Sequence, residues 1–587
     1  MTVTQASERH ASATRRAITL AFAAVIAFLA FGFRLILVRD LTNDHYMHLA
    51  WAQQVLFGEV PGRDFVDPGM PLMYTLSALV QWISRGPFSE AVLDCALLAV
   101  ASAVTFVVTA ELTGSILVGM IASLFEIVVY PRLYSYPKIL VPTVVLLLLQ
   151  RYIRRPDRRT IVLLALWTAV AVLLRHDLGV YAAAGIGVGL AWTHHAAWKQ
   201  GLRALLEYGA SVIVAMIPYV VFVQWSEGLI EHFHEALEFA KGEAHERFLS
   251  PPPFAFIGDP SGFSAWSKMD SAVLLFYAAH LLAIAAAVLL ITRREPRTER
   301  NPVLGAALMM LVLYLVVVLR HPIDSRILDV GAFLAIMGAW VLVETGRRAA
   351  ASLSRGSRAA RVASVTALLS GLAVAAASVA SIWDLGNITL RIQETRVTDG
   401  LGLMERTLKG VKDTGTVWPW ERFWPAGELP EAVRYLNACT TPDDAVLLTW
   451  AAPEYYYFSE RRFGAGHALF LPPDAFTTPH DQERMLARLR AQHVPIVLIN
   501  ETRRAEFANA YRAVDDYLRQ EYVEVGRFQI REGSDVAIAI RRDSTPGRTY
   551  GAERWPCGFE SRAASRTASI RLDGSAMPLP AMSNAVP

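Results

Sequence analysis

An aspartate and a histidine stand four residues apart just after the first apolar segment of the chain, at Asp44 and His48. The segment around them, Arg39 to Tyr74, is polar, acidic and aromatic. Side chains four residues apart share one face of a helix. A carboxylate at the edge of a membrane, where partial burial raises its pKa, is suited to act as a general base for a hydroxyl group. Asp44 is therefore the candidate base, although a cap for a helix from His45 to Phe57 explains it equally well.

Basic and polar side chains in this and later segments have the chemistry to bind a phosphate group. Arginine offers paired donors to phosphoryl oxygens, and charge-assisted hydrogen bonds are roughly twice as strong as neutral ones. The alternative is that boundary arginines only reach the lipid headgroups. The candidate substrate-binding residues are His48, Asp67, Arg132, Lys138, Arg175, His176, Asp177, Arg320, His321 and Arg326.

The composition places these residues in a membrane protein. Of 587 residues, 53% are hydrophobic and only 19% are charged, and the mean hydropathy is +0.33. These values exclude an ordinary soluble protein, and the formal charge of +3 gives no reason to expect nucleic acid as a partner. Apolar segments of spanning or near-spanning length predict about 11 membrane helices. They are expected at residues 17–38, 89–110, 114–130, 137–150, 160–174, 179–193, 207–225, 271–292, 302–319, 325–344 and 362–382.

The apolar stretch Pro71–Ile83 determines the predicted side of every later loop. It is short for a membrane span, so we expect a juxtamembrane helix. The basic loops at 151–159, 194–205, 293–300 and 347–361 then share the side of the basic N-terminus, as the positive-inside rule requires. This arrangement predicts a cytoplasmic N-terminus and places the candidate site residues on the outer side.

The composition changes to that of a soluble protein after the last apolar segment. Alternating helix and strand patterns predict an extracytoplasmic α/β domain from 385 to 542, which follows a membrane domain at 1–384. The remainder, 543–587, is rich in Ser, Ala, Arg, Gly and Pro, and we expect a disordered tail there. The predicted fold class is thus a polytopic α-helical membrane protein with a C-terminal α/β domain.

The cysteines and histidines do not form a recognisable metal motif. Cys95 lies in an apolar segment, and unpaired thiols are favoured over a bridge between Cys439 and Cys557, which stays open as an alternative. A divalent metal stays open but is not indicated, and no cofactor is expected. The histidines concerned lack cysteine partners; they are His45, His48, His232, His234 and His245.

The first polar segment resembles that of a known enzyme family. Its order is Asp-His-Tyr at 44–46, a helix, Gly-Glu-Val-Pro-Gly-Arg-Asp-Phe at 58–65, Asp-Pro-Gly-Met-Pro-Leu at 67–72, and the juxtamembrane helix. This order is similar to that of the GT-C superfamily, in the branch of the protein mannosyltransferases and lipid A aminoarabinose transferases. The resemblance extends in layout over the apolar part of the chain and is specific only in this segment.

The resemblance implies an inverting glycosyltransferase in the plasma membrane or inner membrane, with Asp44 as the base. The donor would be a sugar on a polyprenyl phosphate, and the acceptor a hydroxyl group of a lipid, glycan or protein at the outer face. One departure concerns the Asp that family members usually carry after the third span, because Lys138 stands in about that position. Glu126 could replace it, although a buried glutamate satisfied by a neighbouring helix is the favoured interpretation.

A transporter or flippase for a lipid-linked glycan is the alternative from another class. Such a protein also needs many spans and a cationic cavity on the outer side. It is expected to place ionisable residues near the middle of the membrane and often to consist of two repeated halves. The charges of this chain gather at one predicted face, and the sequence shows no repeat. The pattern therefore favours the transferase.

Overall fold

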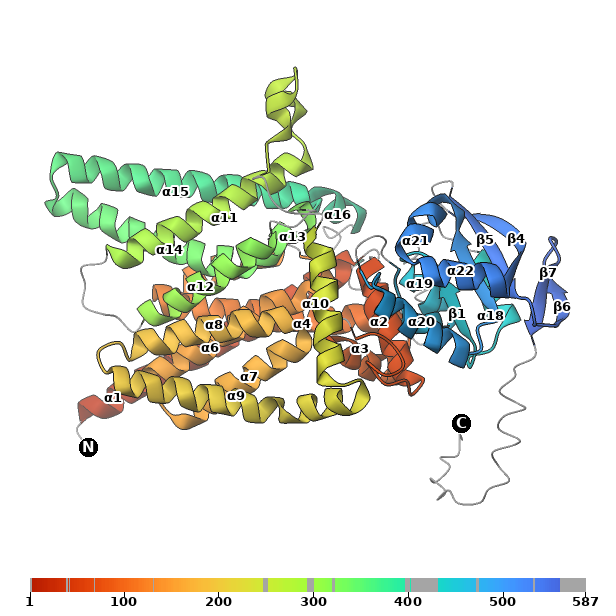
Figure 1. Ribbon diagram of the computed structural model, residues 1–587. Coiled ribbons are helices and arrows are strands. Elements are labelled where there is room, and N and C mark those ends of the chain that lie inside the picture. Colours follow the sequence, from red (N-terminus) through yellow and green to blue (C-terminus); the bar gives the residue numbers. More distant parts are fainter. Residues whose placement is uncertain are drawn as a thin grey trace. The chain divides into compact units, whose positions relative to one another are not determined.

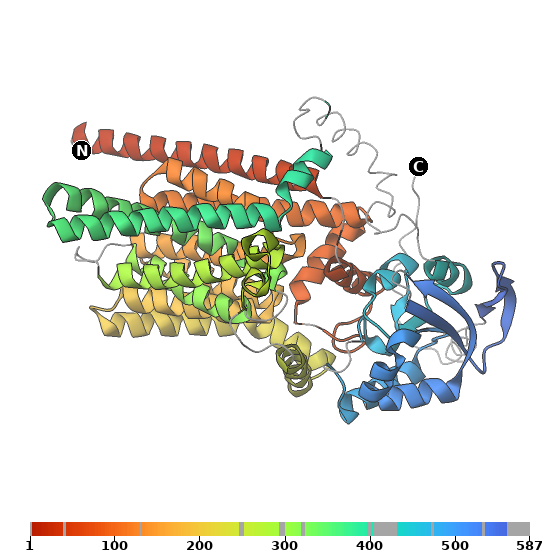
Figure 2. The same ribbon diagram turned by 90° about the horizontal axis from the view of Figure 1, so that it is seen from above.

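The computed structural model describes residues 3–38, 41, 43–67, 69–129, 131–245, 252–292, 300–318, 323–395, 402, 431–470, 475–530 and 534–559. The chain forms two compact units, Met1–Glu428 and Leu429–Pro587, which we name the membrane unit and the C-terminal unit. The membrane unit is a bundle of helices that run roughly along one direction (Figures 1 and 2). All named strands of the described residues belong to the C-terminal unit.

Every apolar segment that was expected to span a membrane forms a helix, which confirms the predicted fold class. Long apolar helices are expected in lipid because they satisfy their own backbone hydrogen bonds. Among the described residues, seven helices are long and apolar enough to cross a membrane, judged by length and composition. These helices are α1, α4, α6, α9, α11, α14 and α15. The bounds are α1 (Val3–Leu37), α4 (Pro87–Thr113), α5 (Ile116–Val129), α6 (Tyr136–Arg154), α7 (Arg158–Leu174), α8 (His176–Thr193), α9 (Trp198–Ser226), α11 (Lys268–Ile291), α12 (Asn301–Val318), α14 (Gly331–Arg355) and α15 (Arg358–Leu385).

Small residues allow these helices to approach one another closely. Ala30 of α1 and Ala99 of α4 belong to one buried apolar cluster with Ile127 of α5. A Cβ atom on Gly119 would lie 2.9 Å from the Cβ of Ala110, so α4 and α5 pack with almost no side chain between them at this point. Such contacts are typical of membrane helices, whose association depends on close packing.

Two short helices fill the polar segment between α1 and α4. They are α2 (Asn43–Leu56) and α3 (Pro71–Ile83). The helix bounds of α3 are those predicted from the sequence, and those of α2 differ by a few residues from the predicted helix. The loop between them turns through Gly58, Gly62 and Gly69, whose φ angles of +81°, +81° and +78° suit glycine far better than other residues.

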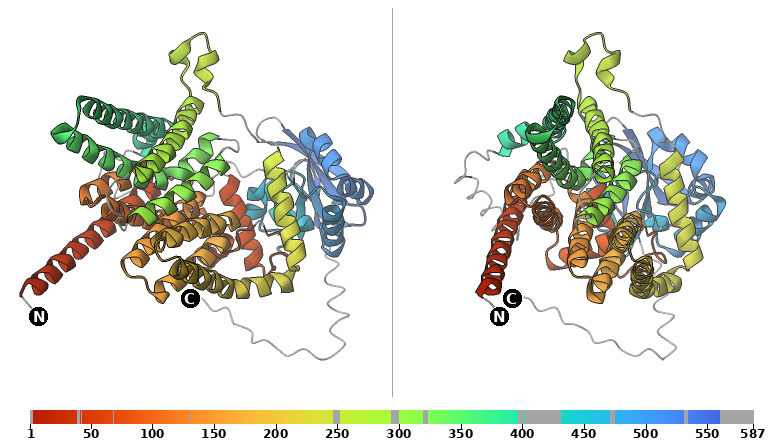
Figure 3. Two further views of the ribbon diagram at one scale, coloured as in Figure 1. Left: turned by 60° about the vertical axis from the view of Figure 1, so that its left-hand side comes forward. Right: turned by 90° about the vertical axis from the view of Figure 1, so that its left-hand side faces the viewer.

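Further short elements lie between the long helices and after the last one. They are η1 (Leu133–Ser135), α10 (Leu229–His245), η2 (Ala255–Gly258), η3 (Gly262–Ala265), α13 (Ile323–Arg326), η4 (Ile327–Val330) and α16 (Ile388–Thr395). Both η2 and η3 project from the end of α11, across the direction of the bundle (Figures 1 and 3).

The C-terminal unit contains a mixed five-stranded sheet with the order β2-β1-β3-β5-β4. Strand β1 pairs in parallel with β2 and β3, whereas β5 is antiparallel to β3 and β4. Both β1 and β3 are buried along their whole length, as expected for continuous apolar runs. The strands are β1 (Ala445–Leu448), β2 (Arg462–Phe463), β3 (Ile496–Asn500), β4 (Tyr522–Ile530) and β5 (Ser534–Arg541), and the helices are α18 (Glu431–Cys439), α19 (Pro453–Ser459), α20 (Pro479–Ala491), α21 (Arg504–Ala510) and α22 (Arg512–Glu521).

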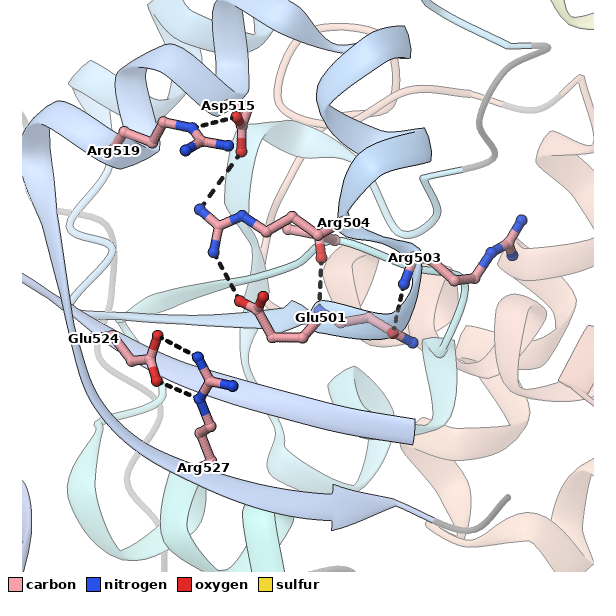
Figure 4. A network of polar contacts seen from close by, with 9 residues as sticks. Glu501, Arg503, Arg504, Asp515, Arg519, Glu524 and Arg527 are labelled. Carbon is pink, nitrogen blue, oxygen red and sulfur yellow. Dashed lines mark hydrogen bonds and ion pairs between the residues drawn. The ribbon is translucent and has the colours of Figure 1, made fainter. Parts of the chain in front are cut away.

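Ion pairs connect the helices on one face of this sheet (Figure 4). Arg504 of α21 lies between Glu501 and Asp515, with nitrogen to oxygen distances of 2.7 Å and 3.7 Å. Arg519 of α22 contacts the other oxygen of Asp515 at 2.6 Å. Acidic and basic side chains alternate in this network, so it joins α21 to α22 without creating a patch of one sign.

The segment 543–587 differs from the expected disordered tail in its described part. Strands β6 (Pro546–Tyr550) and β7 (Trp555–Phe559) form an antiparallel hairpin, and Cys557 of β7 forms a disulfide bond with Cys439 of α18. The expectation of unpaired thiols at these two cysteines is therefore wrong. The hairpin also packs through buried Trp555, whose ring contacts Tyr435 at 5.3 Å between centroids. Proline and glycine in both strands hide their pattern in the sequence.

Candidate functional site

Asp44 lies in the first turn of α2 and forms an ion pair with Arg132. Its Oδ2 atom is 3.3 Å from Nη1 of Arg132, and the two side chains are 40% and 38% exposed. The same Nη1 atom donates a hydrogen bond to the hydroxyl oxygen of Tyr134 at 2.7 Å. Arg132 lies between α5 and η1, so this contact joins two predicted site residues from separate parts of the chain. The candidate base is accessible and is held by a cation.

His45 faces the interior of the bundle, unlike its neighbour Asp44. Its Nε2 atom lies 3.5 Å from Oδ2 of Asp94 on α4, and both side chains are buried. Tyr134 packs edge-on against the His45 ring, with 5.2 Å between centroids. These contacts fix the first turn of α2 and hence the backbone of Asp44. The sequence analysis missed Asp94 because it lies inside a predicted span.

His48 of α2 is buried against Tyr134 and does not lie on the exposed surface. The centroids of the His48 and Tyr134 rings are 6.1 Å apart, and Trp51 lies at a similar distance. Burial, followed by the charge of His45, lowers the pKa of His48 to about 3. A histidine that is neutral at physiological pH is poorly suited to bind phosphate by charge, and its contacts support a packing role.

Lys138 contacts a residue that the sequence analysis did not single out. Its Nζ atom donates to Oδ2 of Asp329 in η4, and both side chains are largely buried. The hydroxyl group of Tyr314 on α12 donates to the backbone oxygen of Lys138 at 3.2 Å. The positive charge that replaces the expected acid is thus balanced by an acid from η4. Asp329 stands three residues after the polar segment that ends at Arg326. This closeness to a predicted site segment was the only feature of the sequence that could have identified it.

The remaining cations lie close enough to act on one another. Arg175 contacts Asp177 at 2.8 Å between Nη2 and Oδ2, and it is one-quarter exposed. The charges of Arg175 and Arg326 both act on Lys138. Arg175 also acts on His48, and Asp329 acts on Arg132. The structure therefore brings Asp44, Arg132, Lys138, Arg175, Asp177 and Arg326 to one end of the bundle. Arg320 and His321 lie outside the described residues.

Asp67 stabilises the loop that follows α2. Its Oδ1 atom accepts hydrogen bonds from the backbone N–H groups of Gly69 at 2.9 Å and Met70 at 3.4 Å. Burial raises the pKa of Asp67, and the charge of His232 opposes this shift. These are the contacts of an aspartate that closes a turn. They account for Asp67 without a substrate.

A chain of hydrogen bonds joins this loop to α8, α9 and α10. The backbone N–H of His176 donates to the oxygen of Gly69 at 3.2 Å. The Nε2 atom of His176 lies 3.2 Å from the Tyr219 hydroxyl group, which lies 3.3 Å from Nε2 of His232. His232 in turn contacts Glu227 at 2.6 Å through Nδ1. His176 therefore takes part in a clasp around the loop, separate from the Asp44 contacts.

Glu126 is buried within the bundle and accepts a hydrogen bond from Ser102 of α4 at 3.1 Å. This contact agrees with the favoured interpretation for one carboxylate oxygen, whereas Oε2 is buried without a hydrogen-bond partner among the described residues. In the described part of the chain, no group of three or more His, Cys, Asp or Glu side chains is arranged to hold a metal ion.

Comparison with known proteins gives a similarity of overall structure. No family model matches the chain, and no curated protein matches it. Among solved structures, the chain is similar to the crystal structure of ArnT from Cupriavidus metallidurans in the apo state. The two chains are 14% identical, the match covers 90% of this chain and 98% of ArnT, and the TM-score is 0.39. The functional assignment rests on the residues described above and not on this likeness.

Proposed function

We propose that this membrane protein is a glycosyltransferase that moves a sugar from a polyprenyl-phosphate donor to a hydroxyl group of a lipid, glycan or protein. The reaction would take place at the outer face of the plasma membrane or inner membrane. The observation that carries the proposal is the accessible Asp44 carboxylate beside Arg132, with further cations at the same end of the bundle. The resemblance of the first polar segment to the GT-C pattern supports the role of Asp44.

Asp44 would act as the general base. It takes the proton of the acceptor hydroxyl group, whose oxygen attacks the anomeric carbon of the sugar. The bond from that carbon to the phosphate oxygen breaks, its electron pair leaves with the polyprenyl phosphate, and the configuration at the carbon inverts. Because Asp44 is only partly buried, an acceptor can reach it without rearrangement of the bundle.

Arg132, Arg175 and Arg326 would stabilise the charge that develops on the leaving phosphate. Guanidinium groups suit this task because they present paired donors and stay charged. Lys138 has a more restricted role, since it is only 15% exposed and its partner Asp329 is also buried, whereas Arg132 and Arg175 are 38% and 25% exposed. It would contribute mainly by holding η4, and with it Arg326, against α6.

Helix α3 would guide the lipid part of the donor. Its side chains Leu79, Trp82 and Ile83 are exposed, although they are large and apolar. Exposed apolar residues on a helix beside a membrane are expected to contact acyl chains. The donor phosphate would then approach the cations from the lipid side.

The test is sugar transfer by the purified full chain in lipid nanodiscs, with a radiolabelled synthetic polyprenyl-phosphate sugar. We expect Asp44→Asn to abolish transfer while expression and thermal unfolding stay close to those of the natural protein. The matched control is Glu207→Gln, which removes a carboxylate from an exposed ion pair with Arg203 on α9. Full activity of folded Asp44→Asn protein would contradict the assignment. Movement of intact donor lipid across the bilayer without transfer would favour a transporter instead.

A further inference from the structure

The segment from Phe254 to Trp266 carries a group of large apolar side chains immediately before α11. It contains η2 and η3, and we name it the aromatic segment. It projects sideways from the end of α11, across the direction of the membrane helices (Figures 1 and 3). Its large apolar residues are Phe254, Phe256, Ile257, Phe263 and Trp266.

The rings of the aromatic segment stack on one another. The Phe256 ring lies 4.5 Å from that of Phe263 and 5.3 Å from that of Trp266, both in stacked geometry. Phe254 contacts Tyr277 on α11 at 5.9 Å. The two short 3₁₀ turns are therefore held face to face, and one of them is joined to the membrane helix.

A buried aspartate fastens the segment to α11. The Oδ1 atom of Asp270 accepts from the backbone N–H groups of Ala255 at 2.6 Å and Phe256 at 3.2 Å. Its Oδ2 atom accepts from the backbone N–H and the hydroxyl group of Ser267. The Trp266 indole donates to Ser271 at 2.9 Å. The segment is thus fixed at several points and is displayed in one orientation.

This rigid segment presents apolar side chains outward. Ile257 is 71% exposed and Phe263 is 76% exposed. Exposed apolar side chains continue from the segment onto α11, at Met269, Leu281 and Ile284. Because α11 is apolar and long enough to cross a membrane, its exposed side faces lipid. The apolar surface of the aromatic segment is therefore continuous with a surface that contacts the bilayer.

We propose that the aromatic segment binds the lipid surface and lies in the interface between the headgroups and the acyl chains, beside the first turn of α11. Tryptophan is enriched at this depth, and the apolar side chains of a segment that lies in the interface, such as Phe and Ile, reach the boundary of the acyl chains. The aromatic segment is attached to the first turn of α11, where the membrane span begins. Its exposed turn carries Asp259, a charged side chain that can stay hydrated among the lipid headgroups. It would fix the depth of α11. The inference does not depend on the proposed transfer reaction.

The experiment measures the depth of spin labels in the full chain reconstituted into phospholipid nanodiscs. Labels are placed at Ile257→Cys and Phe263→Cys, and the free cysteine Cys95 is buried. Two reference positions set the scale: Ile284→Cys on the exposed side of α11, and Glu506→Cys at an exposed site of the C-terminal unit. We expect the ratio of oxygen to nickel-chelate accessibility at 257 and 263 to be several-fold above that at 506 and below that at 284.

Two results would overturn the proposal. A ratio at 257 and 263 equal to that at 506 would show that the segment stands in water. Exclusion of both oxygen and the chelate, unchanged when detergent replaces lipid, would show that a protein surface covers it.

The role of Asp270 is tested with Asp270→Asn, which should increase the mobility of a label at 257, whereas Asp259→Asn should not. Equal mobility in both variants would contradict the anchoring by Asp270.

Discussion

Asp44 and His45 leave the first turn of α2 in different directions because successive residues of a helix are rotated by about 100°. Asp44 is 40% exposed and contacts Arg132, whereas His45 is buried against Asp94. One residue is available for chemistry, and its neighbour anchors the backbone that carries it. The proposed base therefore has a position set by buried contacts and not only by its own ion pair.

The buried pair of Lys138 and Asp329 predicts a strong effect of removing one partner. Lys138→Met leaves Asp329 buried without its counter-charge, which should cost about 3–5 kcal/mol of unfolding free energy. Replacing both, as Lys138→Met with Asp329→Leu, should recover most of that loss. Thermal unfolding in detergent micelles, followed by tryptophan fluorescence, measures the difference. An equal loss in the single and double variants would show that the two residues do not act as a pair.

Residue types near Asp44 could be predicted from the sequence, but their partners could not. Asp44 and Arg132 stand in polar segments, so the sequence could predict that they lie outside the membrane helices. Asp94 and Asp329 lie within or beside apolar segments, and their partners His45 and Lys138 are far away along the chain. Only the packing of α2 and η4 against the bundle brings these groups together.

At the scale of elements, the loop between α2 and α3 depends on glycines with positive φ angles, and one of them lies against Glu227. Gly58 and Gly62 share a φ angle of +81°, but only Gly62 is crowded: a Cβ there would lie 2.6 Å from Oε2 of Glu227. We expect Gly58→Ala to cost about 1–2 kcal/mol from backbone strain alone. Gly62→Ala should cost more, because Glu227 must also move away from His232. Melting temperatures of the two variants test this, and equal shifts would contradict the close contact.

The same clasp predicts a pH dependence of α10. Burial acts to lower the pKa of His232, but the hydrogen bond to Glu227 and the nearby carboxylates raise it overall. The folded state therefore holds this proton more tightly than the unfolded chain, whose histidine pKa is about 6.5. The resulting stability is present below that pH and is lost as pH rises through the folded pKa. The groups around His232 are Asp67, His176, Tyr219, Glu227 and Glu235.

Hydrogen exchange of the α10 backbone measures this effect. Corrected for the intrinsic rate, exchange should become faster as pH rises above about 6.5 and His232 loses its proton. His232→Gln should remove most of this change. His280→Gln is the matched control, because that histidine lies on α11 and contacts the backbone of its own helix. A pH response that persists in His232→Gln would assign it to another group.

At the scale of the whole molecule, apolar length predicted the positions and order of the long helices, because this feature is local. Helices form at all of the segments that were expected to span, but only seven of the described helices are long and apolar enough to cross a membrane, fewer than the 11 expected. The sheet order of the C-terminal unit was not predictable in this way. Strand β4 is largely exposed and alternates weakly, and the β6–β7 hairpin lies in a segment whose composition resembles a tail. Its stability comes from the distant partners Tyr435 and Cys439, which no local pattern reveals.

The Cys439–Cys557 disulfide predicts both the stability and the compartment of the C-terminal unit. It closes a separation of 118 residues, so its loss should cost about 2–4 kcal/mol, mainly through a freer unfolded chain. Tyr435 still donates to the Pro556 oxygen at 2.6 Å, so we expect Cys557→Ser to loosen β6 and β7 without unfolding the central sheet. Limited proteolysis should then cleave the hairpin, while Cys95→Ser, at a buried free thiol, should leave cleavage unchanged.

Disulfides persist in oxidising compartments, so thiol labelling of the natural protein taken from cells should find Cys439 and Cys557 blocked until a reductant is added. Free thiols at both positions would contradict the predicted placement of this unit on the outer side.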